Sequence, residues 1–159
     1  MRVGSLESAE IGAVAFAGAR DEVGGRSRAN LDAALARITE AKHRPAAFAA
    51  DLIDAAQALR MVDDVEAALG PIDVLVNSAG AAKRYAPDDL TAQAWHDAMD
   101  AKFFSYIHPL DIVVRRMAAR GRGSVINIVG AGGKTANPVH IPGGAANAAA
   151  GGRRELADA

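Results

Sequence analysis

The stretch Pro71-Ile-Asp-Val-Leu-Val-Asn-Ser-Ala-Gly80 decides the fold that the sequence predicts. Its apolar run, 72–76, ends abruptly at the small polar turn 77–80. A short Val- and Leu-rich run bounded by turn residues is typical of a buried strand in a parallel sheet. Residues 124–130 repeat the pattern, because Ser-Val-Ile-Asn-Ile-Val-Gly is followed by further small residues. We therefore expect two parallel strands joined by a helix, with ligands bound beyond their carboxyl ends.

Composition excludes several classes of protein. The 159 residues suffice for a single domain over 1–159 with its own core. Half of them are hydrophobic and the formal net charge is −1, so nothing predicts nucleic-acid binding. The chain has no cysteine and no His–carboxylate cluster at ligand spacing, so no metal site is predicted. No apolar run approaches the roughly 18 residues of a membrane span, and 1–10 lack a signal-peptide core, so we expect a cytoplasmic protein without membrane contact.

Apolar runs and helical periodicities alternate along the rest of the chain. This alternation predicts an α/β fold with a Rossmann-like, doubly wound parallel sheet. The runs 47–50, 72–76 and 125–129 are expected to be adjacent, parallel and buried, and 11–17 is a further strand. Pro109 should kink or break the third helix. Helices are expected at 29–42, capped by Ser27 or Asn30; at 55–69, burying Ala58, Leu59, Val62, Val65 and Leu69; at 91–117, capped by Thr91; and at 145–156.

Taken together, these residues resemble the short-chain dehydrogenases/reductases, over roughly residues 26–150. The resemblance lies in Asp51-Leu52, in Asn77-Ser-Ala-Gly80, which is similar to the family's Asn-Asn-Ala-Gly turn, and in the strand 123–128. It implies a Rossmann fold that binds NAD or NADP and acts on a small alcohol or ketone. It also implies that the fold is incomplete, because part of the N-terminal β-α-β unit and the C-terminal strands are missing.

The resemblance assigns cofactor-binding roles to the strand ends. Asp51 would accept from the adenine amino group and Leu52 would pack against the adenine ring. Asn77 would bond to the backbone across the sheet, while Ala79 and Gly80 would let the chain pass close to the cofactor ribose. The plainer interpretation is that Asp51 caps a helix and that residues 77–80 form only a tight turn.

The family's phosphate loop, Thr-Gly-x-x-x-Gly-x-Gly, is only partly matched. Gly18 and Gly24 stand at its first and last glycines, but Glu22 replaces the middle one and would repel a pyrophosphate. If Ile11–Ala17 is the family's first strand, the first helix and second strand have been lost; if it is the second strand, the whole loop is absent. The first register is favoured, because losing a central strand should be more damaging than losing one nearer the edge.

The family's catalytic Asn, Ser, Tyr and Lys are all replaced. Their positions hold Lys102, Gly130, Gly143 and Asn147, and glycine has no side-chain proton to give. His140 could act as a substitute acid and Lys102 could supply a cation, although a solvated histidine and a surface lysine are the plainer interpretations.

Two functions therefore stay open. The first is an NAD(P)-dependent alcohol or carbonyl oxidoreductase that is weak or inactive as this chain stands. The alternative is a non-catalytic remnant that acts as a binding or scaffold module, or a gene fragment. A flavodoxin-like module is a third, less favoured class, since it would lack the Asn77 turn. The sequence decides neither the substrate, nor the oligomeric state, nor NAD against NADP, although Arg26 and Arg28 stand where a 2′-phosphate would be met.

Overall fold

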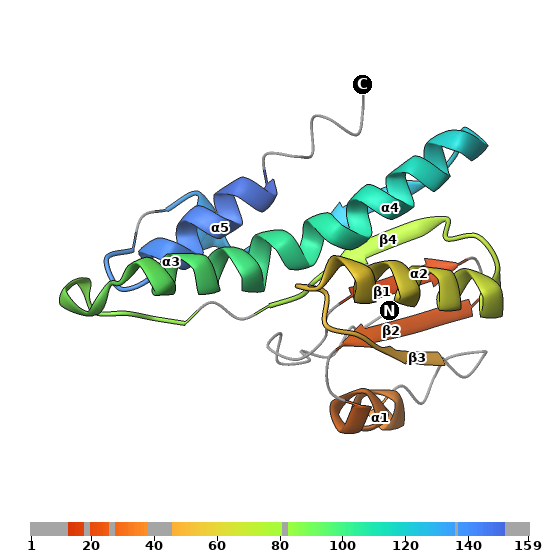
Figure 1. Ribbon diagram of the computed structural model, residues 1–159, viewed down its shortest axis with the longest axis horizontal. Coiled ribbons are helices and arrows are strands. Elements are labelled where there is room, and N and C mark those ends of the chain that lie inside the picture. The colour runs from red at the N-terminus through yellow and green to blue at the C-terminus, as the bar shows by residue number, and fades with distance from the viewer. Residues whose placement is uncertain are drawn as a thin grey trace.

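A computed structural model describes residues 13–17, 20–25, 28–37, 46–80, 83–135 and 137–151 of the chain. Within these ranges the protein is a five-stranded sheet, in the order β3-β2-β1-β4-β5, with helices packed against it (Figure 1). None of the described helices is both long enough and apolar enough to cross a membrane. The strands are β1 (Ala13–Ala17), β2 (Arg20–Gly25), β3 (Ala46–Ala49), β4 (Val74–Asn77) and β5 (Ser124–Asn127). The helices are α1 (Arg28–Arg37), α2 (Ala55–Leu69), α3 (Ala92–Met99), α4 (Ser105–Arg120) and α5 (Ile141–Gly151), with short turns η1 (Pro87–Asp89), η2 (Asp100–Phe104) and η3 (Ala131–Gly133).

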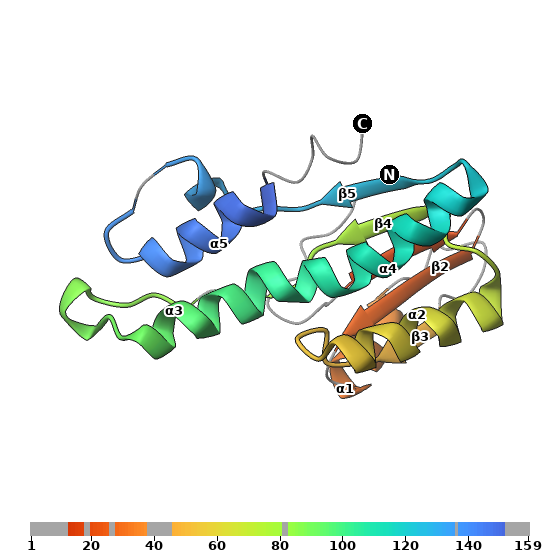
Figure 2. The same cartoon turned by 45° about the horizontal axis from the view of Figure 1, so that its top comes forward.

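The two strands at the centre of the sequence argument form the expected pair. β4 and β5 are adjacent and parallel, and Asn77 lies opposite Asn127 in their register. The chain between them crosses over through α3, η2 and α4, which follow one another as one long helical rod. α4 runs along β4 and β5, while α3 extends beyond the sheet and lies beside α5 (Figure 2). The α/β class and the incomplete Rossmann-like sheet are thus confirmed.

One strand runs against the direction that the sequence predicts. β1 pairs antiparallel with both β2 and β4, so the sheet is mixed rather than fully parallel. Only residues 18 and 19 separate β1 from β2, and so short a connection permits a hairpin but no crossover to a parallel neighbour. β1 takes the central position that the first register requires, but β2 fills the second-strand position that this register counts as lost. Neither register is therefore correct as stated.

The expected adjacency of three strands is also wrong in part. β3 lies at one end of the sheet, where it pairs in parallel with β2, and two strands separate it from β4. Its side chains are half-buried or exposed rather than buried. An edge strand has one neighbour instead of two, which accounts for this exposure.

α2 has the predicted bounds, but its cap and part of its face differ. Asp54, not Asp51, is the N-cap, and its carboxylate accepts from the backbone N–H groups of Ala56 and Gln57. Leu59 is 43% exposed, whereas Met61 is buried. In α1, Asn30 lies inside the helix and is no cap, while Ser27 lies outside the described residues.

Pro109 does not break the long helix. Thr91 caps α3 as predicted, accepting from Ala94 N, and the chain then stays helical from Ala92 to Arg120 (Figure 1). The turn η2 is a π-helix, in which Ser105 N–H donates to the Asp100 carbonyl five residues earlier. The widened turn ends at Phe104, directly before Ser105, whose carbonyl is the one that a proline at position 109 crowds in a regular helix. The last helix, α5, begins at Ile141, earlier than expected.

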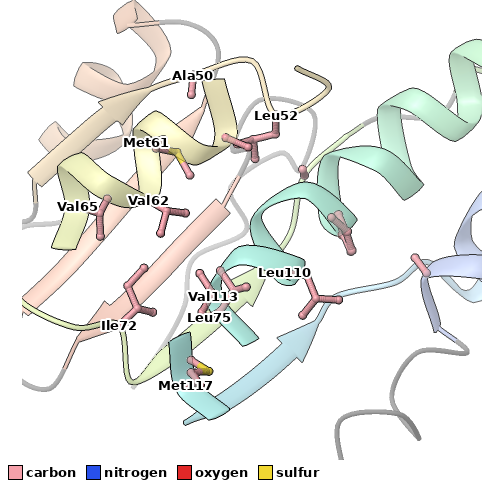
Figure 3. Packing of buried hydrophobic residues seen from close by; sticks show 14 residues of the cluster. Ala50, Leu52, Met61, Val62, Val65, Ile72, Leu75, Leu110, Val113 and Met117 are labelled. Carbon is pink, nitrogen blue, oxygen red and sulfur yellow. The ribbon is translucent and has the colours of Figure 1, made fainter. Parts of the chain in front are cut away.

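The core lies between the sheet and the helices α2 and α4 (Figure 3). Apolar side chains from all three elements meet there, as the cluster in Figure 3 shows. An ionic contact at the surface also joins the two helices, since Arg116 donates to Asp63 and to Glu66. The labelled cluster comprises Ala50, Leu52, Met61, Val62, Val65, Ile72, Leu75, Leu110, Val113 and Met117.

Candidate functional site

The carboxyl ends of β4 and β5 are joined by side chain as well as by backbone. Asn77 is fully buried, and its Nδ2 donates to Asn127 Oδ1 at 2.9 Å. The Asn77 carbonyl accepts from Ile128 N at 2.8 Å, which extends the pairing one residue beyond β5. Asn77 therefore holds the two strand ends together. Its side chain bonds to another side chain, not to the backbone that the resemblance implies.

Gly80 is required by a contact between backbones. Its φ is +81°, and a Cβ placed on it would lie 1.7 Å from the Ala101 carbonyl oxygen in the π turn. No residue with a side chain fits there without moving the helix. Ala79 is 4% exposed and belongs to the core. The small residues of this turn thus let the loop approach η2. Their predicted role beside a cofactor ribose is a separate question.

Asp51 and Leu52 lie in the loop between β3 and α2. Asp51 N donates to Gln57 Oε1, and its carboxylate accepts from Ile53 N at 3.2 Å. The Leu52 side chain is 3% exposed in the core, and its carbonyl lies 2.9 Å from His108 Nδ1. A carbonyl only accepts, so Nδ1 carries the proton. The adenine-binding roles of both residues stay predictions.

The segment expected to form the phosphate loop is largely a strand. Gly18 lies outside the described residues, while Gly24 lies in β2, opposite Ala13 and near the end of β4 that carries Asn77. Because β1 is antiparallel to β4, its carboxyl end lies at the opposite edge of the sheet from Asn77. β1 leads into a strand, so no helix N-terminus follows it to hold a pyrophosphate. The described residues therefore fit the phosphate part of a dinucleotide poorly. Arg28 is paired with Asp32 on the surface of α1.

Three of the four replaced catalytic positions come together through Asn147. Its side-chain Oδ1 accepts from Gly130 N at 2.8 Å, and its Nδ2 donates to the Gly143 carbonyl at 2.8 Å. Asn147 is 4% exposed, and a Cβ on Gly130 would approach its amide to 3.3 Å. The amide thus ties the loop after β5 to the first turn of α5, and neither glycine offers a side-chain proton.

The fourth position, Lys102, lies in the π turn beside a buried tyrosine. Lys102 Nζ donates to Tyr106 Oη at 3.3 Å and lies 5.3 Å from the centre of its ring. The tyrosine hydroxyl donates in turn to the Ile128 carbonyl at 2.6 Å. Burial lowers the pKa of the Lys102 ammonium and raises the pKa of Tyr106 to about 12. The lysine is therefore connected to the end of β5, two residues before Gly130.

His140 precedes α5 and lies against the loop that follows β5. Its ring Cδ2 would be 3.2 Å from a Cβ placed on Gly132. The backbone N donates to the Asn137 carbonyl, and the carbonyl accepts from Gly144 N. Its Nδ1 is buried and has no hydrogen-bond partner among the described residues. The histidine thus has an uncommitted ring nitrogen close to the loop that carries Gly130.

The sequence does not reveal how the predicted site positions are connected. Lys102, Gly130, Gly143, Asn147 and His140 all lie in or against the segments after β4 and β5. Tyr106 went unnoticed, although it lies four residues after Lys102 on one helix, a spacing that brings side chains together. That spacing was the available signal.

With this geometry established, comparison with known proteins identifies the family. The family model of the short chain dehydrogenases matches residues 11–156. The chain belongs to the short-chain dehydrogenase family.

Individual relatives are similar over part of their length. The chain is 28% identical to gluconate 5-dehydrogenase of Gluconobacter oxydans over 125 residues, which are 79% of this chain and 49% of that protein. Its fold matches an actinorhodin polyketide ketoreductase variant solved with NADPH, at a TM-score of 0.79 and 26% identity, covering 85% of this chain and 52% of that one. It also matches a gluconate 5-dehydrogenase of Burkholderia cenocepacia solved with NADP and tartrate, at a TM-score of 0.72 and 28% identity, covering 80% and 50%. The chain thus spans about half the length of these relatives.

Proposed function

We propose that this chain is a weak NAD(P)-dependent oxidoreductase of small alcohols and carbonyl compounds. Family membership supports the reaction class, and relatives solved with NADPH and with NADP support a nicotinamide cofactor. When bound, such a cofactor supplies or accepts a hydride. The identity of the substrate, and NAD against NADP, stay open. A cytoplasmic location and a single domain over 1–159 remain predictions.

We propose weak activity because the Asn147 side chain bridges Gly130 and Gly143. Reduction of a carbonyl leaves an alkoxide, which needs a proton and nearby hydrogen-bond donors. General acid catalysis typically contributes about 10²–10⁴-fold, and an oxyanion donor about 10²–10³-fold. The two glycines have no side chain that could act as the acid or as an oxyanion donor. The Asn147 amide uses its oxygen and its nitrogen in hydrogen bonds to Gly130 and Gly143 within the fold. In this proposal Lys102 and His140 take over the stabilisation of the alkoxide and the donation of the proton.

His140 is the substitute acid in this proposal and Lys102 the cation. A neutral imidazole has one donor and one acceptor nitrogen, and its protonated form can give a proton to an alkoxide. The buried Nδ1 has no partner within the described ranges, so its proton or lone pair is not committed there. The Lys102 ammonium would stabilise negative charge that develops beside the end of β5.

The test is oxidation of NADH and NADPH by the purified chain against a panel of ketones and quinones. Turnover should stay far below the median enzyme rate of about 10 s⁻¹. His140→Ala should lower what turnover there is by about 10²–10⁴-fold. The matched control is His96→Ala, which alters an exposed histidine on α3. Turnover near the median rate would refute the weak-enzyme proposal, and turnover that survives His140→Ala would remove the substitute acid.

The second candidate, a non-catalytic binding module, is favoured by the β1–β2 hairpin. In this hairpin β1 runs away from the strand ends at Asn77, so it leads no phosphate loop and helix N-terminus to them. The two candidates separate in the same assay, since a binding module would show no turnover with any substrate and no loss in His140→Ala. If the chain bound neither NADH nor NADPH and showed no activity, that result would contradict the oxidoreductase proposal and favour a scaffold role.

A further inference from the structure

The helix that carries Lys102 also carries a tyrosine to which the proposed function gives no role. Tyr106 lies four residues later and is 0% exposed. Its hydroxyl contacts both Lys102 Nζ, at 3.3 Å, and the Ile128 carbonyl, at 2.6 Å. One buried group thus touches the candidate cation and the end of the strand that leads to Gly130.

The direction of these hydrogen bonds decides what Tyr106 can do. A tyrosine hydroxyl has a single hydrogen, and a carbonyl oxygen can only accept, so that hydrogen is committed to Ile128. The bond with Lys102 must then run from the ammonium to a lone pair of the hydroxyl. Tyr106 is buried, and burial raises its pKa to about 12, so it does not rebuild the family's tyrosine acid. What it can do is accept from a lysine.

We propose that Tyr106 is a positioning residue that holds the Lys102 ammonium at the carboxyl end of β5. The proposal rests on the proposed function only in giving Lys102 a role in the site. Three features fix the lysine: the π turn that carries it, the hydroxyl that accepts from it, and the ring 5.3 Å away. Among the residues that the structure describes, Lys102 has no ion pair with a carboxylate, so the tyrosine is the polar group that holds it there.

The test follows the ionisation of Lys102 directly, in the chain without any cofactor. Lysine labelled with ¹³C at Cε gives one NMR signal for each of Lys42, Lys83, Lys102 and Lys134. Lys102→Arg removes one signal and so assigns it. In Tyr106→Phe the ring stays but the acceptor is lost, which disfavours the charged amine in its half-buried position. The Lys102 titration midpoint should fall by about one pH unit, while Lys83 and Lys134 keep theirs.

Tyr85→Phe is the matched control, because it removes the hydroxyl of the chain's other tyrosine. It should leave the Lys102 midpoint where it is in the unaltered chain. An unchanged Lys102 midpoint in Tyr106→Phe would overturn the proposal. Since no cofactor takes part, a failure to bind NAD(P) would not affect this outcome, and the two hypotheses fail separately.

A double-mutant cycle separates positioning from a merely structural role. Tyr106→Phe also loses the bond to Ile128, so it should lower stability whatever its effect on the lysine. If Tyr106 acts on Lys102, the loss should be smaller in the Lys102→Met background than in the unaltered chain. Equal losses in the two backgrounds, measured by urea unfolding, would show that Tyr106 only ties α4 to β5 and would contradict the proposal.

Discussion

Asn147 has a structural role at a position where the family resemblance predicts a catalytic lysine. Its amide is nearly fully buried, accepts from Gly130 and donates to Gly143, so both of its functions are used within the fold. A buried polar group that loses its partner costs about 1–3 kcal/mol. The bridge therefore stabilises the loop after β5 and at the same time fills the space beside Gly130.

Asn147→Asp tests this bridge with almost no change in shape. A carboxylate still accepts from Gly130 N but cannot donate to the Gly143 carbonyl, and burial raises the pKa of such a group. A raised folded-state pKa means that stability is present at low pH and is lost as pH rises through that pKa. We expect unfolding free energy to fall by about 1–3 kcal/mol at pH 8 and by clearly less at pH 5, as measured by urea denaturation.

Asn137→Asp is a suitable control, because Asn137 is exposed and its Oδ1 only accepts from Val139 N. A carboxylate can make that bond, so little pH-dependent loss is expected there. An Asn147→Asp chain as stable at pH 8 as at pH 5 would show that the amide does not donate to Gly143.

At the scale of elements, the contact between the loop after β4 and the π turn determines that position 80 must be glycine. Gly80 brings that loop against the Ala101 carbonyl, and the π turn bears Lys102 in the next position. The family resemblance predicts that this glycine makes room for a cofactor ribose. The structure gives it a nearer neighbour, which no pattern within a single strand-end turn could reveal.

Gly80→Ala should therefore be far more damaging than an alanine at another glycine with positive φ. Gly121 ends α4 at φ +67° with nothing within 4 Å of a Cβ, so Gly121→Ala should cost only about 1–2 kcal/mol of backbone strain. Gly80→Ala adds a collision with backbone and should cost more than about 4 kcal/mol or prevent folding. Thermal or urea unfolding compares the two, and equal effects would contradict the close approach.

The elements also show which sequence signals were reliable. α2 kept its predicted bounds because a clear apolar period ends at Gly70, whose φ of +94° suits glycine. The sequence does not predict β2, because Asp21, Glu22 and the glycines 24 and 25 have low strand propensity. Pairing with β1 on one side and β3 on the other outweighs that propensity. The reversal of β1 shows in its antiparallel pairing with β2 and with β4, and β4 lies 57 residues further along the chain, beyond the reach of a local pattern.

For the whole molecule, the reversed strand β1 alters the phosphate part of the expected binding site, whereas the ends of β4 and β5 lie where they were expected. β4 and β5 end side by side at Asn77 and Asn127, as their repeated sequence pattern predicts. The phosphate part of that site would require a loop and a helix N-terminus after β1. The carboxyl end of β1 lies instead at the opposite end of the sheet, where Ala17 pairs with Arg20 at the start of β2. An expectation about Glu22 changes with it: Glu22 lies in β2, so Glu22→Gly should weaken a strand rather than improve a phosphate loop.

We propose that this family member keeps the strand ends of a dinucleotide site but has no phosphate cradle among the residues that the structure describes. Isothermal titration calorimetry of the purified chain with NADH and with NADPH tests it most directly. Losing several charge-assisted hydrogen bonds, at about 1.5–3 kcal/mol each, predicts a dissociation constant well above about 1 µM for both cofactors. Asp51→Ala should weaken the remaining binding further if the adenosine half docks there. A dissociation constant of about 1 µM or tighter for either cofactor would contradict the account.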